Sequence, residues 1–521
     1  MKHFKLLLHT WAVLSAAVVL FAGAGMSQAD DSTTVIFDEN YIGTYHLEFY
    51  IDDWEDSLVF NYENGEEYMP ARFICGDIEL DSIGVRYKGN SSYTMSMSSK
   101  KKPLKFKFDK YKDYTFYDEK ILNFVNCVKD PSFMRERIGY AIAAKYMPVP
   151  RTSYANIYIE GELIGFYIQV EQVDKEFLSR HFMDNDFNLY KVGDAGAGLL
   201  YLGGDKAAYD SLYNLKTNED QDDWSRFIHM LDVLNNAPDS TFVRDIKQHL
   251  NIDRCIQHIA LSMVISHFDS YAGSGRNYYF YDDVPGRQFQ LIPWDHDQCF
   301  GVFGNNWDVI RADIIEFPHL DQRPLLRRVL ENDSLRQVYI GYIEEMVTGP
   351  CSEDSIAAVA QRIRPLIDSS VQADPNKFFS YDDFITNIES GVSLGPAGSI
   401  PGLASFARQR NQEILGQIEE YRSMPIRSAF QNKASPEMSV SSFISGGGDV
   451  TVRYKLAAKD ESAILSIFTA QGQCLERVQV GGKPFGINEY VWKNHYIPGG
   501  VYFFRLSSKE KILTDRLTVI R

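Results

Sequence analysis

The chain has 521 residues, of which 45% are hydrophobic and 24% are charged, and its net charge is −17 at pH 7. These values are typical of a globular protein, and the length allows two or three domains with a large core. The acidic balance and the lack of a long basic run exclude nucleic acid as an expected partner.

The first 29 residues have the features of a secretory signal peptide. Two lysines precede an apolar segment over residues 11–24, and Ser27-Gln28-Ala29 is typical of a cleavage site before Asp30. An uncleaved membrane anchor is the alternative, but the apolar segment is short for that purpose. Because no later segment reaches a spanning length, we expect an exported, secreted or cell-surface protein without a stable membrane span.

The cysteines leave two interpretations open. An even number of them in an exported protein permits disulfides, whereas their wide spacing is equally compatible with buried free thiols. None forms a Cys-x-x-Cys pair, so a zinc site is not supported. The six are Cys75, Cys127, Cys255, Cys299, Cys351 and Cys474.

Short alternating runs near the N-terminus predict strands of an antiparallel sheet. They are residues 34–37, 45–50, 71–74 and 83–87. The last run leads into Lys88-Gly89-Asn90-Ser91-Ser92, where glycine and hydroxyl residues could present N–H groups to phosphate oxygens. An ordinary turn is the alternative interpretation, and it is the commoner one for such a sequence.

A lysine-rich segment follows and begins a further strand. Lys100-Lys101-Lys102-Pro103 precedes residues 104–108, in which lysine alternates with apolar residues. One face of this strand is therefore basic, which suits either a solvated edge strand or contact with ATP phosphates.

The next segments predict a helix and a hairpin. Asp130-Pro131 indicates a helix start, and Arg135 on this helix is expected to be structural. Residues 156–170 alternate around a Glu-Gly turn and end at Glu171, whose carboxylate could orient the phosphate-binding lysine or simply charge the start of a helix.

The segment from Ile265 to Gly301 carries the densest set of polar functional residues. We expect helical structure over residues 238–268, in which the last helix has Asp253 near its start and leads to Asp269. A glycine-rich turn at 272–275 and two strands at 277–281 and 289–293 follow. Acidic and amide side chains therefore lie at the ends of regular elements, and their oxygens suit Mg²⁺ or Mn²⁺. They are Asp269, Asn277, Asp295 and Asp297.

Helices are expected again near residues 325–330, 335–347, 355–367 and 403–421. The composition then changes at Ser435-Pro436, beyond which short alternating runs with frequent turns predict a C-terminal all-β sandwich. The expected organisation is a signal peptide (1–29), an α+β domain (30–430) and the sandwich (431–521).

Over residues 35–430 the chain resembles the CotH (spore-coat protein H) kinase family. The motifs that carry the resemblance occur in the family's order: Asp269, Asn277-Tyr278-Tyr279, Pro293-Trp294-Asp295-His296-Asp297 and Phe300-Gly301. Arg86–Ser92 and Glu171-Gln172 also resemble family segments. The resemblance implies an atypical minimal protein-kinase-like fold and ATP-dependent protein phosphorylation.

The resemblance also implies roles for individual residues. Asp269 would accept or orient the proton of the acceptor hydroxyl, and Trp294 would wall the site. Asn277 and Asp295 would bind the metal, with Asp297 beside them. Lys102, which stands at the family's Lys-Lys-Ser/Pro step, and Lys88 would contact ATP, with Glu171 orienting Lys102. Lys105 is the second candidate for the phosphate contact, and Lys191 is a less favoured nucleotide contact. The Asp-to-Asn spacing is longer than in ordinary kinases and Asp-Phe-Gly is absent, so roles taken from those enzymes are analogies.

The C-terminal segment resembles the sorting domain of type IX secretion cargo in Bacteroidetes-like bacteria. The resemblance rests on Gly472-Gln473, on Pro498–Tyr502 and on the terminal Thr518–Arg521. It implies the type IX machinery as a partner, whereas a general β-sandwich binding module is the alternative.

Taken together, the sequence predicts an exported metal-dependent kinase that transfers the γ-phosphate of ATP to Ser, Thr or Tyr of a secreted or cell-surface protein. Three alternatives stay open: a binding or adhesion protein without transfer activity, an ATP-dependent AMPylase or glutamylase, and a calcium-binding module without EF-hand spacing.

Overall fold

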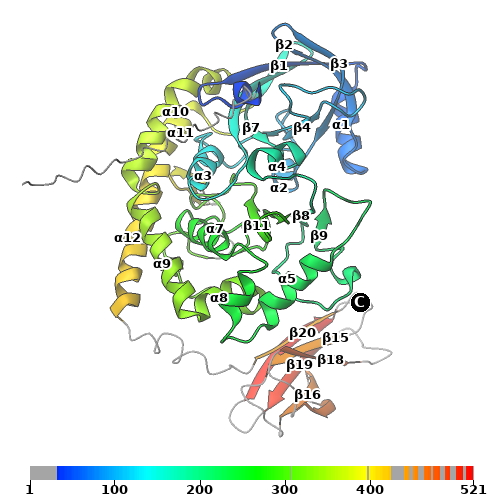
Figure 1. Cartoon of the computed structure of the whole chain (residues 1–521), viewed down its shortest axis with the longest axis vertical. Helices are drawn as coiled ribbons and strands as arrows, with labels where there is room; N and C mark the ends of the chain where they lie inside the picture. Colours follow the sequence, from blue (N-terminus) through cyan, green and yellow to red (C-terminus); the bar gives the residue numbers. More distant parts are fainter. Residues whose placement is uncertain are drawn as a thin grey trace, which may run out of the picture. The chain divides into compact units, whose positions relative to one another are not determined.

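A computed structural model gives the chain a mixed α and β architecture (Figure 1). It describes residues 32–304, 307–395, 398–423, 439–444, 450–455, 463–470, 473–480, 487–492, 500–507 and 512–519. The chain divides into two compact units. The first holds the residues up to Tyr140, Val149–Asp186 and Gln361–Ile385, and the second holds Ala141–Pro148, Phe187–Ala360 and Thr386–Arg521.

The first unit is built on a closed seven-stranded barrel, drawn in blue to cyan in Figure 1. Its order is β1-β2-β3-β4-β5-β7-β6, and all neighbours are antiparallel except β1 and β6. That parallel pair closes the sheet into a barrel. It can form because β5 pairs with β7 and leaves an edge of β6 free to pair with β1. The sequence pattern did not predict this closure. The strands are β1 (Ile42–Phe49), β2 (Met69–Cys75), β3 (Ile78–Tyr87), β4 (Leu104–Lys107), β5 (Ile121–Val125), β6 (Thr152–Ile159) and β7 (Glu162–Glu171).

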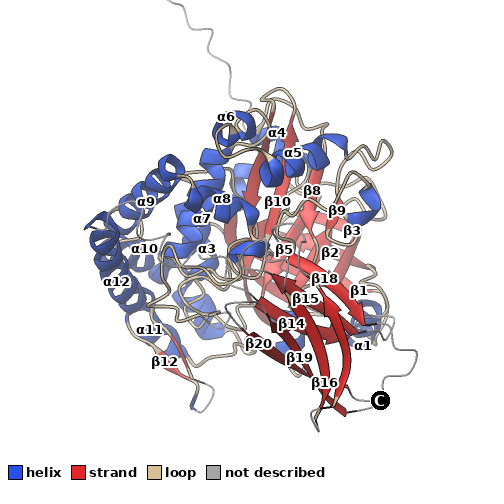
Figure 2. Ribbon diagram, turned by 90° about the horizontal axis from the view of Figure 1, so that it is seen from below, coloured by secondary structure: helices blue, strands red, loops and turns tan. Residues whose placement is uncertain are grey.

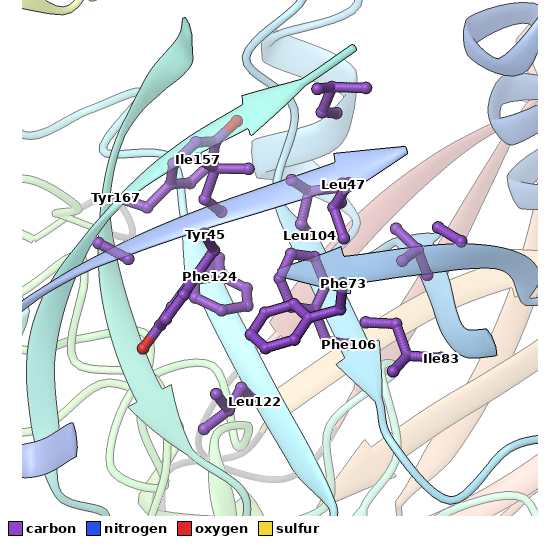
Figure 3. Close-up of a cluster of buried hydrophobic side chains, with 14 of the residues drawn as sticks. Tyr45, Leu47, Phe73, Ile83, Leu104, Phe106, Leu122, Phe124, Ile157 and Tyr167 are labelled. Atoms are coloured by element: carbon purple, nitrogen blue, oxygen red, sulfur yellow. The ribbon is translucent and has the colours of Figure 1, made fainter. Parts of the chain in front are cut away.

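Alternate residues of these strands fill the barrel interior, and many of them are aromatic (Figure 3). Phe73 is fully buried and packs edge-on against the rings of Phe106 and Phe116. The hydroxyl of Tyr45 is satisfied inside the core because it donates to Oε1 of Gln169 at 2.7 Å. Removing a ring from such a core, as in Phe73→Ala, costs about 3–5 kcal/mol.

In some helices of this part of the chain, a local side chain satisfies the first N–H groups. The helices of this part are α1 (Trp54–Glu63), α2 (Ser91–Met95), α3 (Arg135–Ala143), α4 (Lys175–His181), α10 (Glu353–Ala373) and α11 (Tyr381–Glu389). Asp174 caps α4 by accepting from the N–H groups of Glu176 and Phe177. Some of these helices continue beyond the first unit along the chain.

Two elements of this region differ from the prediction. Residues 34–37, expected as a strand, belong to the 3₁₀ helix η1 (Ser32–Phe37). The helix expected to begin at Asp130-Pro131 begins at Arg135, because Asp130 accepts from the Arg135 N–H at 2.9 Å and also holds the Arg135 guanidinium at 2.6 Å. Arg135 is fully buried in this pair, as expected of a structural residue.

The second unit contains an antiparallel sheet of order β11-β10-β8-β9 and several helices (Figures 1 and 2). The strands are β8 (Leu189–Val192), β9 (Tyr213–Leu215), β10 (Tyr278–Asp283) and β11 (Gln288–Pro293). One face is covered by α5 (Ser225–Asn236), whose Phe227 stacks on Tyr190 of β8 with ring centroids 4.5 Å apart. This packing fixes the ends of β10 and β11, next to which the polar residues predicted for the site lie.

The helical segment expected over residues 238–268 consists of two helices, and the last of them has Asp253 near its start, as predicted. The two helices are α6 (Phe242–Ile246) and α7 (Ile252–Val264), and α7 packs against α9 (Asp333–Thr348). Helix α7 is buried over most of its length and ends five residues before Asp269, since the chain turns at Ser266 with a φ of 45°. The remaining elements are α8 (Pro324–Glu331), α12 (Leu403–Ser423), η2 (Lys206–Ala208), η3 (Leu320–Gln322), β12 (Val392–Ser393) and β13 (Ser399–Ile400).

The regular elements described from residue 439 onward are all strands, as the sequence predicted for this segment in general terms. They form a sheet of order β14-β15-β18 and a second of order β17-β16-β19-β20, with buried residues of both in one core. The strands are β14 (Ser439–Ile444), β15 (Val450–Lys455), β16 (Ile464–Thr469), β17 (Cys474–Gln479), β18 (Ile487–Trp492), β19 (Gly500–Ser507) and β20 (Ile512–Val519). The predicted boundary at Ser435-Pro436 and the signal peptide lie outside the described residues.

Two further findings concern the whole described chain. All six cysteines are free thiols, and four of them are buried. Among the described residues, no helix combines the length and the apolar character needed to cross a lipid bilayer.

Candidate active site

Asp269 lies in the turn that follows α7 and is only half-buried. The turn is fixed by backbone hydrogen bonds, including one from the His267 N–H to the Ser262 carbonyl at 2.7 Å. The Oδ1 atom of Asp269 is buried and has no hydrogen-bond partner among the described residues. An unsatisfied carboxylate oxygen is costly in a folded protein, so this atom is available to a substrate proton or a cation.

Asn277 holds the other oxygen of Asp269. Its Nδ2 group donates to the Asp269 carbonyl at 2.7 Å and to Asp269 Oδ2 at 3.1 Å. These bonds use the amide nitrogen, so the amide oxygen of Asn277 is the acceptor left for a ligand. The prediction placed Asn277 in a strand, but its φ is 61° and β10 begins at the next residue.

The pairing of β10 with β11 brings the Trp-Asp segment next to Asn277. Tyr278 lies opposite Pro293, and the Trp294 N–H donates to the Asn277 carbonyl at 3.0 Å. Asp295 therefore follows directly after the residue that is bonded to Asn277, and it adopts a φ of 58°. Non-glycine residues in this left-handed region carry strain that is often found at functional sites.

The acidic residues of this segment alternate with a buried histidine. Asp295 and Asp297 are half-buried, whereas His296 between them is almost fully buried. Trp294 is buried as well, and its ring meets the edge of Tyr279 at a centroid distance of 5.8 Å. The predicted wall of the site is therefore part of the aromatic packing of the sheet.

Arg323, which the sequence analysis did not single out, fixes the turn between Asp269 and Asn277. Its guanidinium donates to the carbonyls of Tyr271 at 2.8 Å and Gly273 at 2.7 Å. The turn also needs glycine, because a Cβ atom on Gly273 would lie 2.0 Å from the Phe268 carbonyl oxygen. The glycines gave the only sequence signal for this turn, and nothing marked Arg323.

The oxygen atoms of this segment fit a hard divalent cation. Carboxylate and amide oxygens are the ligands that Mg²⁺ and Mn²⁺ prefer, and Oδ1 of Asp269 lacks a protein partner within the described chain. Over the same residues, no group of three or more His, Cys, Asp and Glu side chains is arranged to hold a metal ion. A cation there would therefore need the amide of Asn277 or atoms of a substrate in addition to carboxylates.

In the first unit, Lys102 is the buried lysine that the sequence favoured for phosphate contact. Its ammonium donates to the Ser99 carbonyl at 2.8 Å and lies 3.6 Å from a carboxylate oxygen of Glu55 on α1. It also lies 5.4 Å from the centroid of the Tyr87 ring. Glu55 was not predicted, since a glutamate in the first turn of a helix has no distinguishing sequence signal.

Lys88 directly follows β3, and Lys102 lies in the segment just before β4. The Lys88 N–H donates to the Pro103 carbonyl at 3.1 Å, which continues the β3–β4 pairing by one residue. The following Gly89 has a φ of 81°, and its carbonyl accepts from the Tyr62 hydroxyl of α1. The two lysines predicted for ATP contact therefore come from adjacent chain segments of the first unit.

The expected pairing of Glu171 with Lys102 is not what the structure shows. The Glu171 carboxylate is fully buried and is held by Arg151 at 3.2 Å and by Arg180 of α4. It also accepts from the Arg151 N–H at 2.9 Å. Arginine binds a buried carboxylate with several parallel donors, so the arginine pairs stabilise Glu171 more than a single lysine contact would.

The other two lysines of the segment are held within the protein. Lys101 is fully buried, and its ammonium lies 2.7 Å from the equally buried carboxylate of Asp374. Lys105, the second candidate for phosphate contact, donates to Oε1 of Gln172 at 2.9 Å. Lys102 thus remains the best candidate of the three for contact with a ligand.

Comparison with known proteins adds independent findings. The family described as CotH kinase protein matches residues 85–414. The chain is also 25% identical over 346 residues to a protein of Bacillus subtilis (strain 168) named Inner spore coat protein H. That alignment covers 64% of this chain and 88% of the Bacillus protein.

Proposed function

The chain belongs to the CotH kinase protein family, and from this membership we propose that it transfers the γ-phosphate of ATP to a hydroxyl group of another protein. The acceptor is a serine, threonine or tyrosine of a secreted or cell-surface protein. The reaction depends on a divalent metal ion, Mg²⁺ or Mn²⁺. The family membership gives the kinase-like class of activity, and the acceptor, the metal and the export are parts of the proposal.

The observation that carries the proposal is the fixed relationship between Asp269 and Asn277. Asn277 holds one oxygen of the Asp269 carboxylate, while the other oxygen has no partner among the described residues. A carboxylate that is oriented on one side and unsatisfied on the other is suited to accept the acceptor proton. In a purely structural turn, the unsatisfied carboxylate oxygen would lower stability without any compensating function.

In the proposed reaction the acceptor oxygen forms a bond to the γ-phosphorus, and the bond between that phosphorus and the β–γ bridging oxygen breaks. ADP leaves with the electron pair of the broken bond. The proton of the acceptor hydroxyl passes to the free oxygen of Asp269. Positioning and charge neutralisation supply most of the catalysis in such a transfer.

The metal would be held by Asn277 and Asp295, with Asp297 beside them. When bound, a divalent cation neutralises charge on the phosphate oxygens. The protein positions these side chains at the ends of β10 and β11. Trp294, buried directly before Asp295, keeps water away from that side of the segment.

Lys102 and Lys88 are proposed to contact the ATP phosphates. The Lys102 ammonium is buried, and among the described residues the carboxylate of Glu55, at 3.6 Å, is the one that forms an ion pair with it. Glu55 therefore replaces Glu171 as the carboxylate that orients this lysine. Glu171 is proposed to act only indirectly, by fixing the end of β7 through its arginines.

The experiment is intact-mass spectrometry of the full chain incubated with ATP and Mg²⁺ or Mn²⁺. The proposal expects a phosphate-sized mass gain in the wild type, or in an added acceptor protein, that disappears in Asp269→Asn and Asp295→Asn. An AMP-sized gain would keep the site but change the reaction. The absence of any gain and of ATP-dependent thermal stabilisation would indicate a binding protein instead.

We also propose that the protein is exported and sorted by the type IX machinery. The support is the sequence of the first 29 residues and the strand-rich C-terminal part. Truncation before residue 431 is expected to leave the protein in the periplasm. Secretion of the truncated chain at the wild-type level would refute this part of the proposal.

A further inference from the structure

A pair of lysines in the second unit forms no ion pair with a carboxylate of the described residues. Lys191 lies in β8, and Lys216 directly follows β9 and continues the pairing, since its N–H donates to the Leu189 carbonyl at 2.8 Å. Neither ammonium forms an ion pair or a hydrogen bond with a described residue.

The strand register puts both side chains on one face of the sheet. Lys191 lies opposite Asn214, and Lys216 is two residues beyond Asn214 along the same strand. Residues at such diagonal positions are about 7 Å apart, which long side chains can span. The structure also records their repulsion: partial burial and the neighbouring Lys191 lower the pKa of Lys216, and only Glu219 acts in the opposite direction.

The same face leads to the candidate active site. Lys191 lies opposite Tyr279 of β10, and its ammonium is 6.0 Å from the centroid of that ring. Tyr279 in turn meets Trp294, the residue before Asp295. The lysine pair is therefore connected to the proposed metal-binding segment through two buried aromatic rings.

We propose that Lys191 and Lys216 form a binding site for the polyphosphate chain of the nucleotide. Two adjacent ammonium groups on an otherwise acidic protein attract a ligand with more than one negative charge, and such a ligand removes their mutual repulsion. The site lies in the same unit as Asp269 and Asp295. The inference rests on the proposed function, because it names a further part of the nucleotide site.

The test measures the two amines directly and does not require catalysis. The full chain is acetylated briefly with an amine-reactive reagent, with and without tripolyphosphate, and the labelling of each lysine is read by peptide mass spectrometry. A bound polyphosphate slows labelling by a factor of about 1 + [L]/Kd, which is about tenfold at ten times Kd. The expected result is such protection at Lys191 and Lys216, and its loss at Lys216 in the Lys191→Gln variant.

Lys206 is the internal control, because it lies on the same unit but is paired with Asp222 and Asp210. Equal protection of Lys206, or equal protection by sulfate at the same ionic strength, would mean general screening and would overturn the inference. Protection by a phosphoserine peptide but not by tripolyphosphate would overturn the nucleotide as the ligand. Thermal melting of Lys191→Gln checks that the variant is folded.

The labelling result and the proposed function can fail separately. Protected lysines in a chain that transfers no phosphate would leave the anion site standing and refute the kinase activity. Phosphate transfer with unprotected lysines would refute the anion site and leave the kinase activity standing.

Discussion

The imidazole rings of His267 and His296 lie with their centroids 4.9 Å apart, and both side chains are almost fully buried. His267 precedes Asp269 by two residues, and His296 lies between Asp295 and Asp297. The ring contact therefore ties the turn after α7 to the segment after β11. The histidine pair is thus one of the contacts between two chain segments that carry different parts of the candidate site.

Burial of the histidines predicts a specific loss of stability in acid. Burial lowers the pKa of His258 and of His267 to about 3, below the value of about 6.5 in the unfolded chain. The unfolded state then binds protons that the folded state excludes. The contribution of the buried neutral histidines to stability is fully present above about pH 6.5. Below that pH the free energy of unfolding falls by about 1.4 kcal/mol per histidine for each pH unit, down to about pH 3.

Urea denaturation between pH 7 and pH 4.5 measures this effect. Because glutamine does not titrate, His258→Gln should lose stability less steeply with falling pH than the wild type, whatever its stability at pH 7. The exposed His229→Gln is the control and should follow the wild type. Parallel curves for wild type and His258→Gln would show that His258 is not a buried neutral group.

Replacing the proposed base should remove activity without unfolding the protein. Asp269→Asn keeps the shape of the side chain but cannot accept the proton, so kcat should fall by about 10² to 10⁴. The melting temperature should change little, because Asp269 Oδ1 makes no hydrogen bond that a described residue would lose. Asp253→Asn on the exposed side of α7 is the matched control, and equal activity of both variants would exclude Asp269 as the base.

The lysines of the Lys100–Lys105 segment should differ in function. Lys102→Met is expected to reduce kcat/KM for ATP by about 10- to 100-fold, the range for a lost charge-assisted hydrogen bond. Lys105→Met should have a much smaller effect, because its ammonium is used by Gln172. Steady-state kinetics at varied ATP decide between them, and a larger effect of Lys105→Met would reverse the assignment.

Lys101 should matter for stability instead of activity. Its ion pair with Asp374 is fully buried, and Asp374 also accepts from the Phe166 N–H at 3.0 Å. Lys101→Met leaves a buried carboxylate unpaired and should cost about 3–5 kcal/mol. Chemical denaturation of Lys101→Met, Asp374→Asn and the double variant measures the coupling. Additive effects of the two substitutions would contradict a direct pair.

Arg323 should act on the active site through the turn that it holds. Lysine cannot donate to the carbonyls of Tyr271 and Gly273 with the fork geometry of a guanidinium. Arg323→Lys should therefore lower kcat while leaving KM for ATP nearly unchanged, since no described contact joins Arg323 to the lysines assigned to phosphate. A change in KM alone would indicate that Arg323 contacts the nucleotide.

The sequence was most informative where local pattern and structure coincide. Alternation of apolar residues predicted most barrel strands, and the order of Asp269, Asn277 and Asp295 along the chain predicted the residues that the β10–β11 pairing brings near one another. The family resemblance was confirmed over residues 85–414. These features depend on contacts between neighbours in the sequence or on a linear motif.

The sequence was least informative where distant residues decide the structure. The parallel β1–β6 pair, the arginines around Glu171 and the Glu55–Lys102 contact all join residues far apart in the chain. Local rules also failed at Asp130, where a carboxylate that normally caps a helix instead holds an arginine five residues away. The backbone of Asn277 has a left-handed φ, which β-rich flanking residues concealed.

The most direct test of the central claim is a comparison of two labelled forms of ATP. The full chain and an acceptor protein are incubated with metal ion and with ATP that is labelled at either the γ- or the α-phosphate. The account predicts that protein retains the γ label only, and that Asp269→Asn retains neither. Retention of the α label would contradict phosphoryl transfer, and equal γ labelling by Asp269→Asn would contradict the proposed site.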